Sequence, residues 1–205
     1  MNNAIAADLV NNQLREALAT HEALLASEII RDQLVTWGRI CADSLAAGGA
    51  VFFAGNGGSF ADAQHLAAEL TGKMSRMRPP LAGIALGTNN SSLSAIGNDF
   101  GFEYTFAREL EGLARSQSVV VAITTSGNSR NILDLATQAK AMDLPCLGLT
   151  GSGGGELAQI CETIQVPSSR TERIQEMQIL LGHTLCLLIE EFLGIFETQA
   201  QDTRP

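Results

Sequence analysis

The sequence predicts an α/β fold: a doubly wound five-stranded parallel sheet flanked by helices, with an N-terminal helical extension. Short apolar runs of strand length alternate with helical stretches from residue 51 onwards. The run at 119–124 is apolar almost throughout, which is typical of a strand buried on both faces of a parallel sheet. Hydrophobic residues make up 45% of the 205 residues and aromatic residues only 5%, a mixture that suits helices packed on a sheet better than a β-sandwich.

Residues 1–48 are predicted to be helical and to precede the sheet. Apolar residues recur there at roughly helical spacing, from Leu9 to Ile40. Gly48 and Gly49 end this pattern. Because a small α/β core has no place for so long a helical segment, its apolar positions are expected to pack against the core or another subunit.

The elements that follow form one domain at 49–197, with a tail at 198–205. Each strand is a short apolar run, and glycine-rich or hydroxyl-rich turns separate the strands from the helices. The predicted strands lie at 51–54, 82–86, 119–124, 146–149 and 163–166. The predicted helices lie at 59–77, 91–113 with a break near 97–101, 131–142, 155–160 and 171–196. In such a sheet, ligands gather at the carboxyl ends of the strands.

Charge and cysteine content limit the class of protein. The formal net charge of −9 argues against nucleic acid as a partner, although one loop can still bind a small anion. Cys41, Cys146, Cys161 and Cys186 form no C-x-x-C pair and are expected to be reduced thiols, mostly buried. Residues 1–9 lack a basic region and an apolar run, and no apolar segment reaches membrane-spanning length. We therefore expect a cytoplasmic protein that does not bind membranes.

Two strands are predicted to end in the same kind of turn, at 54–59 (AGNGGS) and at 124–129 (TTSGNS). Each turn precedes a helix, so it exposes backbone N–H groups where an anion is favoured. The hydroxyls of Thr124, Thr125, Ser126 and Ser129 can add hydrogen-bond donors for phosphate oxygens. Neither turn matches a Walker or dinucleotide-binding motif. Each alone could be an ordinary capped turn, but two in one domain favour a phosphate site.

The ionisable residues offer a second kind of site. His65 and Glu69 are four residues apart on a predicted helix, so they share one helical face. They form half of a metal site, an acid–base pair or an ordinary surface contact. His183 lies in an apolar helix, where a packed core histidine is the usual interpretation, and His21 is interpreted as structural.

Six strings of residues, read in order between residues 50 and 193, resemble the sedoheptulose 7-phosphate isomerases, which carry a sugar isomerase (SIS) domain. The strings are Gly55-Asn56-Gly57-Gly58-Ser59, Asp62-Ala63-Gln64-His65, Ala68-Glu69-Leu70-Thr71-Gly72, Gly97-Asn98-Asp99-Phe100-Gly101, Thr125-Ser126-Gly127-Asn128-Ser129 and Arg173-Ile174-Gln175-Glu176. Singly they indicate a SIS domain, and jointly they indicate the phosphoheptose isomerase branch.

This resemblance implies conversion of sedoheptulose 7-phosphate to D-glycero-D-manno-heptose 7-phosphate through an enediol(ate), the first step towards activated heptose. It also implies a homotetramer with active sites between subunits and one Zn²⁺ per subunit. The heptose could feed lipopolysaccharide, a surface-layer glycan or a small-molecule glycoside.

The resemblance also assigns roles to individual residues. The substrate-binding set would be Asn56, Gly57, Gly58, Ser59, Glu69, Asn98, Asp99, Thr124, Thr125, Ser126, Ser129 and Gln175. The zinc ligands would be His65, Glu69, Gln175 and His183. Glu69 and His183 would also be the catalytic acid–base pair.

The zinc ligands Gln175 and His183 raise a geometric question, because they are eight residues apart on one predicted helix. At a rise of ~1.5 Å per residue they lie about 12 Å apart along the axis, too far for one metal. Either Gln175 precedes the regular helix, or the two residues serve sites in different subunits, which we favour.

Three positions depart from the expected family pattern. Thr124 stands where serine is common, Glu172 replaces a common aspartate, and Gln178 stands where histidine is frequent. Thr124 should keep the hydroxyl, whereas Gln178 could slow the enzyme or weaken its hold on zinc.

Two other functions compete with the isomerase. One is a non-catalytic SIS protein that binds the replication initiator and promotes chromosome replication. That branch lacks counterparts of Glu69 and His183, and both residues are present here. The other is a sugar-phosphate-sensing regulator, but residues 1–48 contain no basic recognition helix.

Overall fold

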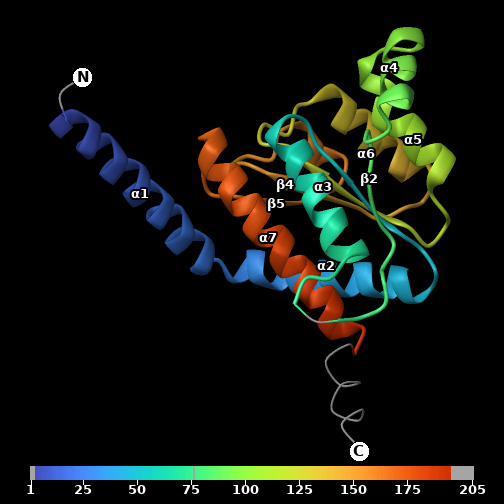
Figure 1. Ribbon diagram of the computed structural model, residues 1–205, viewed down its shortest axis with the longest axis horizontal. Coiled ribbons are helices and arrows are strands. Elements are labelled where there is room, and N and C mark those ends of the chain that lie inside the picture. Colours follow the sequence, from blue (N-terminus) through green and yellow to red (C-terminus); the bar gives the residue numbers. More distant parts are fainter. Residues whose placement is uncertain (1–2, 76, 195–205) are drawn as a thin grey trace, which may run out of the picture.

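The protein is described by a computed structural model covering residues 3–75 and 77–194 (Figure 1). Its centre is a five-stranded sheet in the order β2-β1-β3-β4-β5, and every neighbouring pair is parallel. The strands are β1 (Val51–Ala54), β2 (Gly83–Ala85), β3 (Val119–Ile123), β4 (Cys146–Thr150) and β5 (Glu162–Gln165). The predicted five-stranded parallel sheet is confirmed.

Helices cover both faces of this sheet (Figure 1). Within the described ranges they are α1 (Asn3–Leu25), α2 (Glu28–Ala46), α3 (Gly58–Thr71), α4 (Asn90–Asp99), α5 (Thr105–Leu113), α6 (Arg130–Ala141) and α7 (Thr171–Phe192), with short 3₁₀ turns η1 (Phe102–Tyr104) and η2 (Glu156–Gln159). One core cluster joins the sheet to α2, α3 and α7 through Trp37, Leu66 and Leu181. The second cluster joins the opposite face to α5 and α6 through Phe106 and Ile132. The doubly wound arrangement is therefore confirmed.

The N-terminal extension is two helices rather than one. The chain turns at Ser27, whose side chain accepts a hydrogen bond from the backbone N–H of Ile30 and so caps α2. Helix α2 packs on the core through Trp37 and Cys41, whereas Thr20 is the one buried residue of α1. Figure 1 shows α1 extending away from the body of the molecule.

The predicted end of the helix at 59–77 is wrong, because α3 ends at Thr71. Gly72 follows, and the guanidinium of Arg78 folds back onto the end of the helix. Its Nη1 donates to the carbonyl oxygen of Leu70 at 2.8 Å, and its Nη2 donates to that of Glu69 at 2.7 Å. These bonds satisfy carbonyl groups that a helix end leaves without partners.

The predicted end of the last helix also differs, because α7 stops at Phe192 and Gly194 has a φ of +69°. Residues 195–196, the domain boundary at 197 and the tail at 198–205 lie outside the described residues. The predicted break at 97–101 comes later, because α4 continues to Asp99 and the 3₁₀ turn η1 follows at Phe102–Tyr104. The predicted helix at 155–160 is the 3₁₀ turn η2, and the remaining boundaries from β1 to β5 agree within one residue. No helix in the described parts of the chain combines the length and the apolar character that crossing a membrane requires.

The order of the strands fixes where a ligand can bind. Strand β1 lies between β2 and β3, so the chain leaves β1 towards one edge of the sheet and returns to build the other. The switch point of this topology therefore lies between the carboxyl ends of β1 and β3. Crevices at such points are the usual ligand sites of open α/β sheets.

Candidate functional site

The two predicted loops meet at this switch point. The Gly-rich loop, residues 55–59, follows β1 and leads into α3, and the hydroxyl loop, residues 124–129, follows β3 and leads into α6. The side-chain amides of Asn56 and Asn131 join them by two reciprocal hydrogen bonds of 2.8 and 2.9 Å. Asn131 is buried, so this pair fixes the separation of the two loops. Asn131 was not among the predicted site residues, although its place in the first turn of α6 was a usable signal.

The hydroxyl loop brings several hydroxyl groups together at the carboxyl end of β3. The hydroxyls of Thr124 and Ser129 lie 3.2 Å apart. The Ser126 hydroxyl accepts a hydrogen bond from the backbone N–H of Asn128, which closes the turn. Thr125 and Ser126 are at least partly exposed. With the start of α6 directly after Ser129, the loop has the features of an anion site.

Gly127 holds the hydroxyl loop against the loop after β4. Its φ is +69°, and a Cβ there would lie 2.1 Å from the carbonyl oxygen of Gly154. We expect Gly127→Ala to push the two loops apart and to raise the KM for a phosphorylated substrate. Gly153→Ala is the control, because Gly153 also has a positive φ of +90° but has nothing within 4 Å of a Cβ. Equal kinetics for the two variants would show that the close approach does not matter.

Gln178 is hydrogen-bonded to the backbone of the hydroxyl loop. It is buried in α7, and its Nε2 donates to the carbonyl oxygens of Thr124 at 3.3 Å and Leu149 at 2.9 Å. Its Oε1 is buried and has no hydrogen-bond partner among the described residues. The side chain thus connects the ends of β3 and β4. Gln178, which stands where histidine is frequent in the family, therefore helps to hold the hydroxyl loop in place.

We expect Gln178→Leu to destabilise the protein by ~1–3 kcal/mol, because two buried carbonyl groups lose a donor. It should also weaken binding of a sugar phosphate through the displaced Thr124. Urea unfolding and the KM of the variant check both effects. Gln117→Leu, at an exposed glutamine, is the matched control. An unchanged unfolding midpoint for Gln178→Leu would contradict this role.

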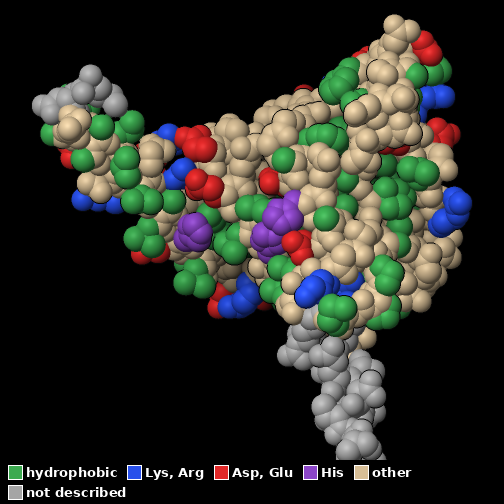
Figure 2. All heavy atoms as spheres, viewed as in Figure 1, with side chains coloured by type: hydrophobic (Ala, Val, Ile, Leu, Met, Phe, Trp, Pro, Cys, Tyr) green, Lys and Arg blue, Asp and Glu red, His purple; other side chains and the backbone are tan. Residues whose placement is uncertain are grey.

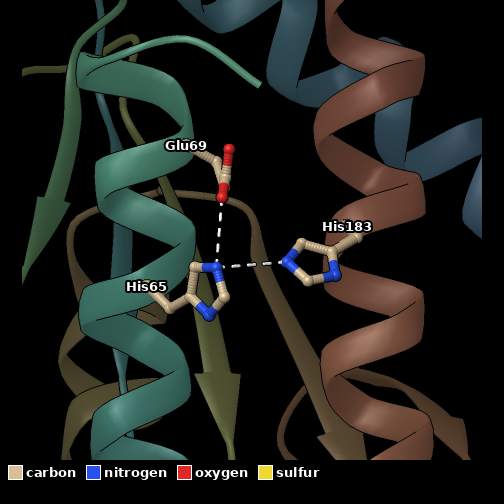
Figure 3. A group of neighbouring side chains, drawn as sticks. All are labelled: His65, Glu69 and His183. Carbon is tan, nitrogen blue, oxygen red and sulfur yellow. Dashed lines mark hydrogen bonds and ion pairs between the residues drawn. The ribbon is translucent and has the colours of Figure 1, made fainter. Parts of the chain in front are cut away.

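The ionisable residues form a second group, on the neighbouring faces of α3 and α7 (Figure 3). His65 Nε2 lies 3.1 Å from Glu69 Oε1 and 3.4 Å from His183 Nε2. The two imidazole rings meet edge to face, with centroids 4.8 Å apart. His65 is exposed, and Glu69 and His183 are partly exposed, so solvent reaches all three. Figure 2 shows histidine and acidic side chains gathered on this face.

The spacing of these three side chains fits a metal ion. Their ligand atoms all lie within 4.8 Å of one another. Two nitrogens each ~2.0–2.1 Å from a tetrahedral Zn²⁺ lie about 3.3 Å apart, close to the separation of the two Nε2 atoms. Two imidazoles and a carboxylate are also a donor set that Zn²⁺ accepts, with a fourth position open. The sequence around His183 suggests a packed core histidine, but the structure places this residue in the cluster.

Close contact between α3 and α7 produces this spacing. A Cβ on Gly182, the residue before His183, would lie 2.5 Å from a methyl carbon of Leu66, the residue after His65. Gly58, at the start of α3, lies against Gln175, near the start of α7. Because both contacts advance in the same direction along the chain, the two helices run parallel. A side chain at position 182 would have to displace the methyl groups of the buried Leu66, so glycine suits this close approach.

Asp62 is a residue to which the sequence interpretation assigned no role. It lies one turn before His65 on α3, and its Oδ2 is buried without a hydrogen-bond partner among the described residues. Burial raises the pKa of the carboxyl group, and the nearby His65 and His183 oppose the rise. The spacing of positions 62, 65 and 69, which share one helical face, was the available signal.

The structure does not bring every predicted site residue together. Gln175 lies within the regular helix α7, so the alternative that it precedes the helix is wrong. Its amide lies against Gly58 at the Gly-rich loop, where a Cβ would meet Nε2 at 2.5 Å, two turns from His183. Ser59 is buried with 3% of its surface exposed. Gly57, with a φ of +57°, is the N-cap residue directly before α3.

Asn98 and Asp99 also lie apart from the cluster. They occupy the exposed end of α4, where the Asn98 amide donates to Asp99 Oδ1 at 2.7 Å. Asp99 lines a hollow between α4, α5 and β2. A smaller hollow of about 130 Å³ adjoins the Gly-rich loop and contains Asn56 and Phe102 among its lining residues.

Comparison with known proteins gives consistent matches. The model of the SIS domain family matches residues 13–151, beginning within the helical extension. Phosphoheptose isomerase 1 of Campylobacter jejuni is 47% identical over 182 residues, which cover 88% of this chain and 98% of that protein. The phosphoheptose isomerase of Rhodospirillum rubrum is 52% identical over 151 residues, covering 73% of this chain and 80% of that protein.

Solved structures agree with these matches. The phosphoheptose isomerase of Neisseria gonorrhoeae superposes with a TM-score of 0.84 at 36% identity and covers 91% of this chain and 99% of its own. That of Francisella tularensis superposes with a TM-score of 0.85 at 29% identity, covering 91% of this chain and 98% of its own.

Proposed function

The chain belongs to the SIS domain family and, within it, to the phosphoheptose isomerases, and we propose that it converts sedoheptulose 7-phosphate to D-glycero-D-manno-heptose 7-phosphate. The observation that carries this proposal is the cluster of His65, Glu69 and His183, of which His65 and Glu69 lie on the helix that begins at the Gly-rich loop. Isomerisation needs a base and an acid, and the cluster supplies both. A protein that only binds the replication initiator has no need of these groups.

In the proposed reaction a proton leaves C1 of the ketose and a proton arrives at C2. Glu69, a partly exposed carboxylate, takes the proton from C1 and leaves an enediolate. The proton of the O1 hydroxyl moves to O2, and His183 delivers a proton to C2, which completes the aldose. Each group of this kind is typically worth ~10²–10⁴ in rate. His65, hydrogen-bonded to Glu69 at 3.1 Å, orients the carboxylate.

We propose that His65, Glu69 and His183 hold one Zn²⁺ per subunit, with Gln175 of a neighbouring subunit as a further ligand. The Nε2 separation of 3.4 Å supports the first three. Gln175 lies two turns from His183 in α7, which supports a role as a zinc ligand in the site of a neighbouring subunit. Bound Zn²⁺ supplies a Lewis acid that stabilises the negative charge of an enediolate.

The loops at the switch point are proposed to bind the rest of the substrate. Thr124, Thr125, Ser126 and Ser129 would hold the phosphate, and the exposed N–H groups of Gly57 and Gly58 would contact the sugar together with Asn56. Glu69 and Gln175 would also contact the substrate. Ser59 would act through its backbone, because its side chain is buried. Asn98 and Asp99 would contact sugar hydroxyls, from this subunit or a neighbour.

We propose a cytoplasmic homotetramer with active sites between subunits. Helix α1 supports this assembly because large apolar side chains are exposed along it (Figure 2). Leu9, Leu14 and Leu18 are 53%, 65% and 59% exposed. Large apolar side chains exposed along a helix are typical of an interface.

The test of the proposed function is turnover of sedoheptulose 7-phosphate by the wild-type protein, with and without added Zn²⁺. Formation of the aldose phosphate, lost on chelation and restored by Zn²⁺, is the expected result. Absence of turnover by folded protein with one Zn²⁺ per subunit would overturn the heptose assignment. Fructose 6-phosphate serves as a control for the length of the sugar.

A further inference from the structure

Two cysteines lie side by side at the amino ends of β4 and β5. The loops of the proposed active site lie at the opposite, carboxyl ends of the strands. Strands β4 and β5 pair Leu147 with Glu162, and Cys146 and Cys161 each stand one residue before this pair. Neighbouring strands are ~4.8 Å apart. A disulfide spans Cα separations of about 4.4–6.8 Å, so the backbone spacing suits a cross-link.

The two side chains also face the same way. Both cysteines pack against the core cluster under α6, whereas Leu147 and Ile164 belong to the cluster on the opposite face. Both line one surface hollow of about 340 Å³, together with Lys140 and Pro145. Both are partly exposed. A small oxidant in this hollow can therefore reach Cys161, the less buried of the two thiols.

We propose that Cys146 and Cys161 are an oxidation site, separate from the isomerase site, at which a hydroperoxide converts the two thiols to a disulfide. The Cys161 sulfur attacks the peroxide oxygen and becomes a sulfenic acid, and one water or alcohol leaves. The Cys146 sulfur then attacks the Cys161 sulfur, the S–S bond forms, and the sulfenic oxygen leaves as water. Two thiols are oxidised and one peroxide is reduced.

The electrostatics of the pair decide which sulfur attacks first. A hydrogen bond from the Cys146 thiol lowers the pKa of Cys161, and the same bond, with burial, raises the pKa of Cys146. The thiolate is the nucleophile, so Cys161 is the reactive partner and Cys146 resolves the intermediate.

The chain contains a second pair of cysteines that serves as an internal control. Cys41 and Cys186 are 0% and 1% exposed and belong to the core cluster of α2 and α7. Burial raises the pKa of Cys186 to about 12 and raises that of Cys41 further. Under conditions that oxidise the first pair, both should remain thiols.

The experiment treats the native protein with hydrogen peroxide, follows its intact mass and maps the linked peptides. We expect loss of two hydrogens, one peptide pair joining Cys146 to Cys161, and reversal by dithiothreitol. Cys146→Ser should stop at a sulfenic acid on Cys161 that dimedone traps, and Cys161→Ser should give no dimedone adduct. Free thiols at both positions after peroxide treatment of wild-type protein would overturn the proposal, as would a link to Cys41 or Cys186.

The cross-link has a structural consequence that can also be measured. Strand β5 is a four-residue edge strand, and the disulfide would tie its start to β4. Oxidised protein should show slower amide hydrogen exchange in β5 and a higher Tm than reduced protein, with isomerase turnover unchanged. Identical exchange in the two forms would contradict this consequence.

Discussion

Glu69→Gln is expected to lower turnover of sedoheptulose 7-phosphate by a factor of ~10²–10⁴, the usual worth of a general base. Glutamine keeps the shape of the side chain and one oxygen, but it cannot take the proton from C1. It also keeps a polar atom beside His65, whose Nε2 now lies 3.1 Å from Glu69 Oε1. Steady-state kinetics with added Zn²⁺ measures the effect.

The zinc content of this variant separates two roles of Glu69. An inactive variant that retains Zn²⁺ points to lost base chemistry, and one that has lost Zn²⁺ points to lost ligation. Glu111→Gln, at an exposed carboxylate on α5, is the matched control and should keep wild-type kinetics. Turnover within threefold of wild type by Glu69→Gln would remove Glu69 from the mechanism.

The second large effect concerns stability and an ion pair at the far end of α3. Arg78 and Glu190 have side chains that are 1% and 0% exposed, and Nε lies 2.5 Å from Oε1. Ser75 donates a further hydrogen bond of 3.1 Å to the same carboxylate. Arg78→Met leaves Glu190 buried with its charge uncompensated and removes the cap of α3. We expect a loss of ~3–5 kcal/mol in the free energy of unfolding, measured by urea denaturation.

A double variant tests whether the loss comes from the unpaired charge. Arg78→Met combined with Glu190→Leu removes both charges and should recover a large part of the stability, because apolar replacement of a buried pair is often close to neutral. Arg31→Met is the control, since its pair with Glu28 is exposed. A double variant no more stable than Arg78→Met would show that the cap of α3, and not the pairing, carries the effect.

The sequence predicted the sheet well because parallel strands buried on both faces leave a strong apolar signal. Strand β1 was predicted without error, and β3 within one residue. The end of α3 was missed because Arg78, seven residues beyond Thr71, supplies its cap. A residue that satisfies a helix end from outside the helix leaves no periodic pattern to read.

The parts of the site formed by residues close together in the sequence were predictable. The two loops were identified by composition, and His65 with Glu69 by their spacing on one helix. His183 comes from a helix more than a hundred residues later, so only the resemblance assigned it to the same site. Contacts across the fold, such as Asn56 with Asn131 and Gln178 with Thr124, depend on the packing of α3, α6 and α7 and have no local signal.

The glycine at position 182 has a consequence for the choice of metal. With Leu66 seated against its Cα, the helices α3 and α7 are held at the distance that leaves 3.4 Å between the imidazole nitrogens. If the methyl group of an alanine at 182 pushed the helices apart rather than the Leu66 side chain aside, the proposed site would favour a larger ion, such as Cd²⁺, over Zn²⁺. In the proposed zinc site, the ionic radius accepted would thus depend on a residue that binds no metal and has no side chain.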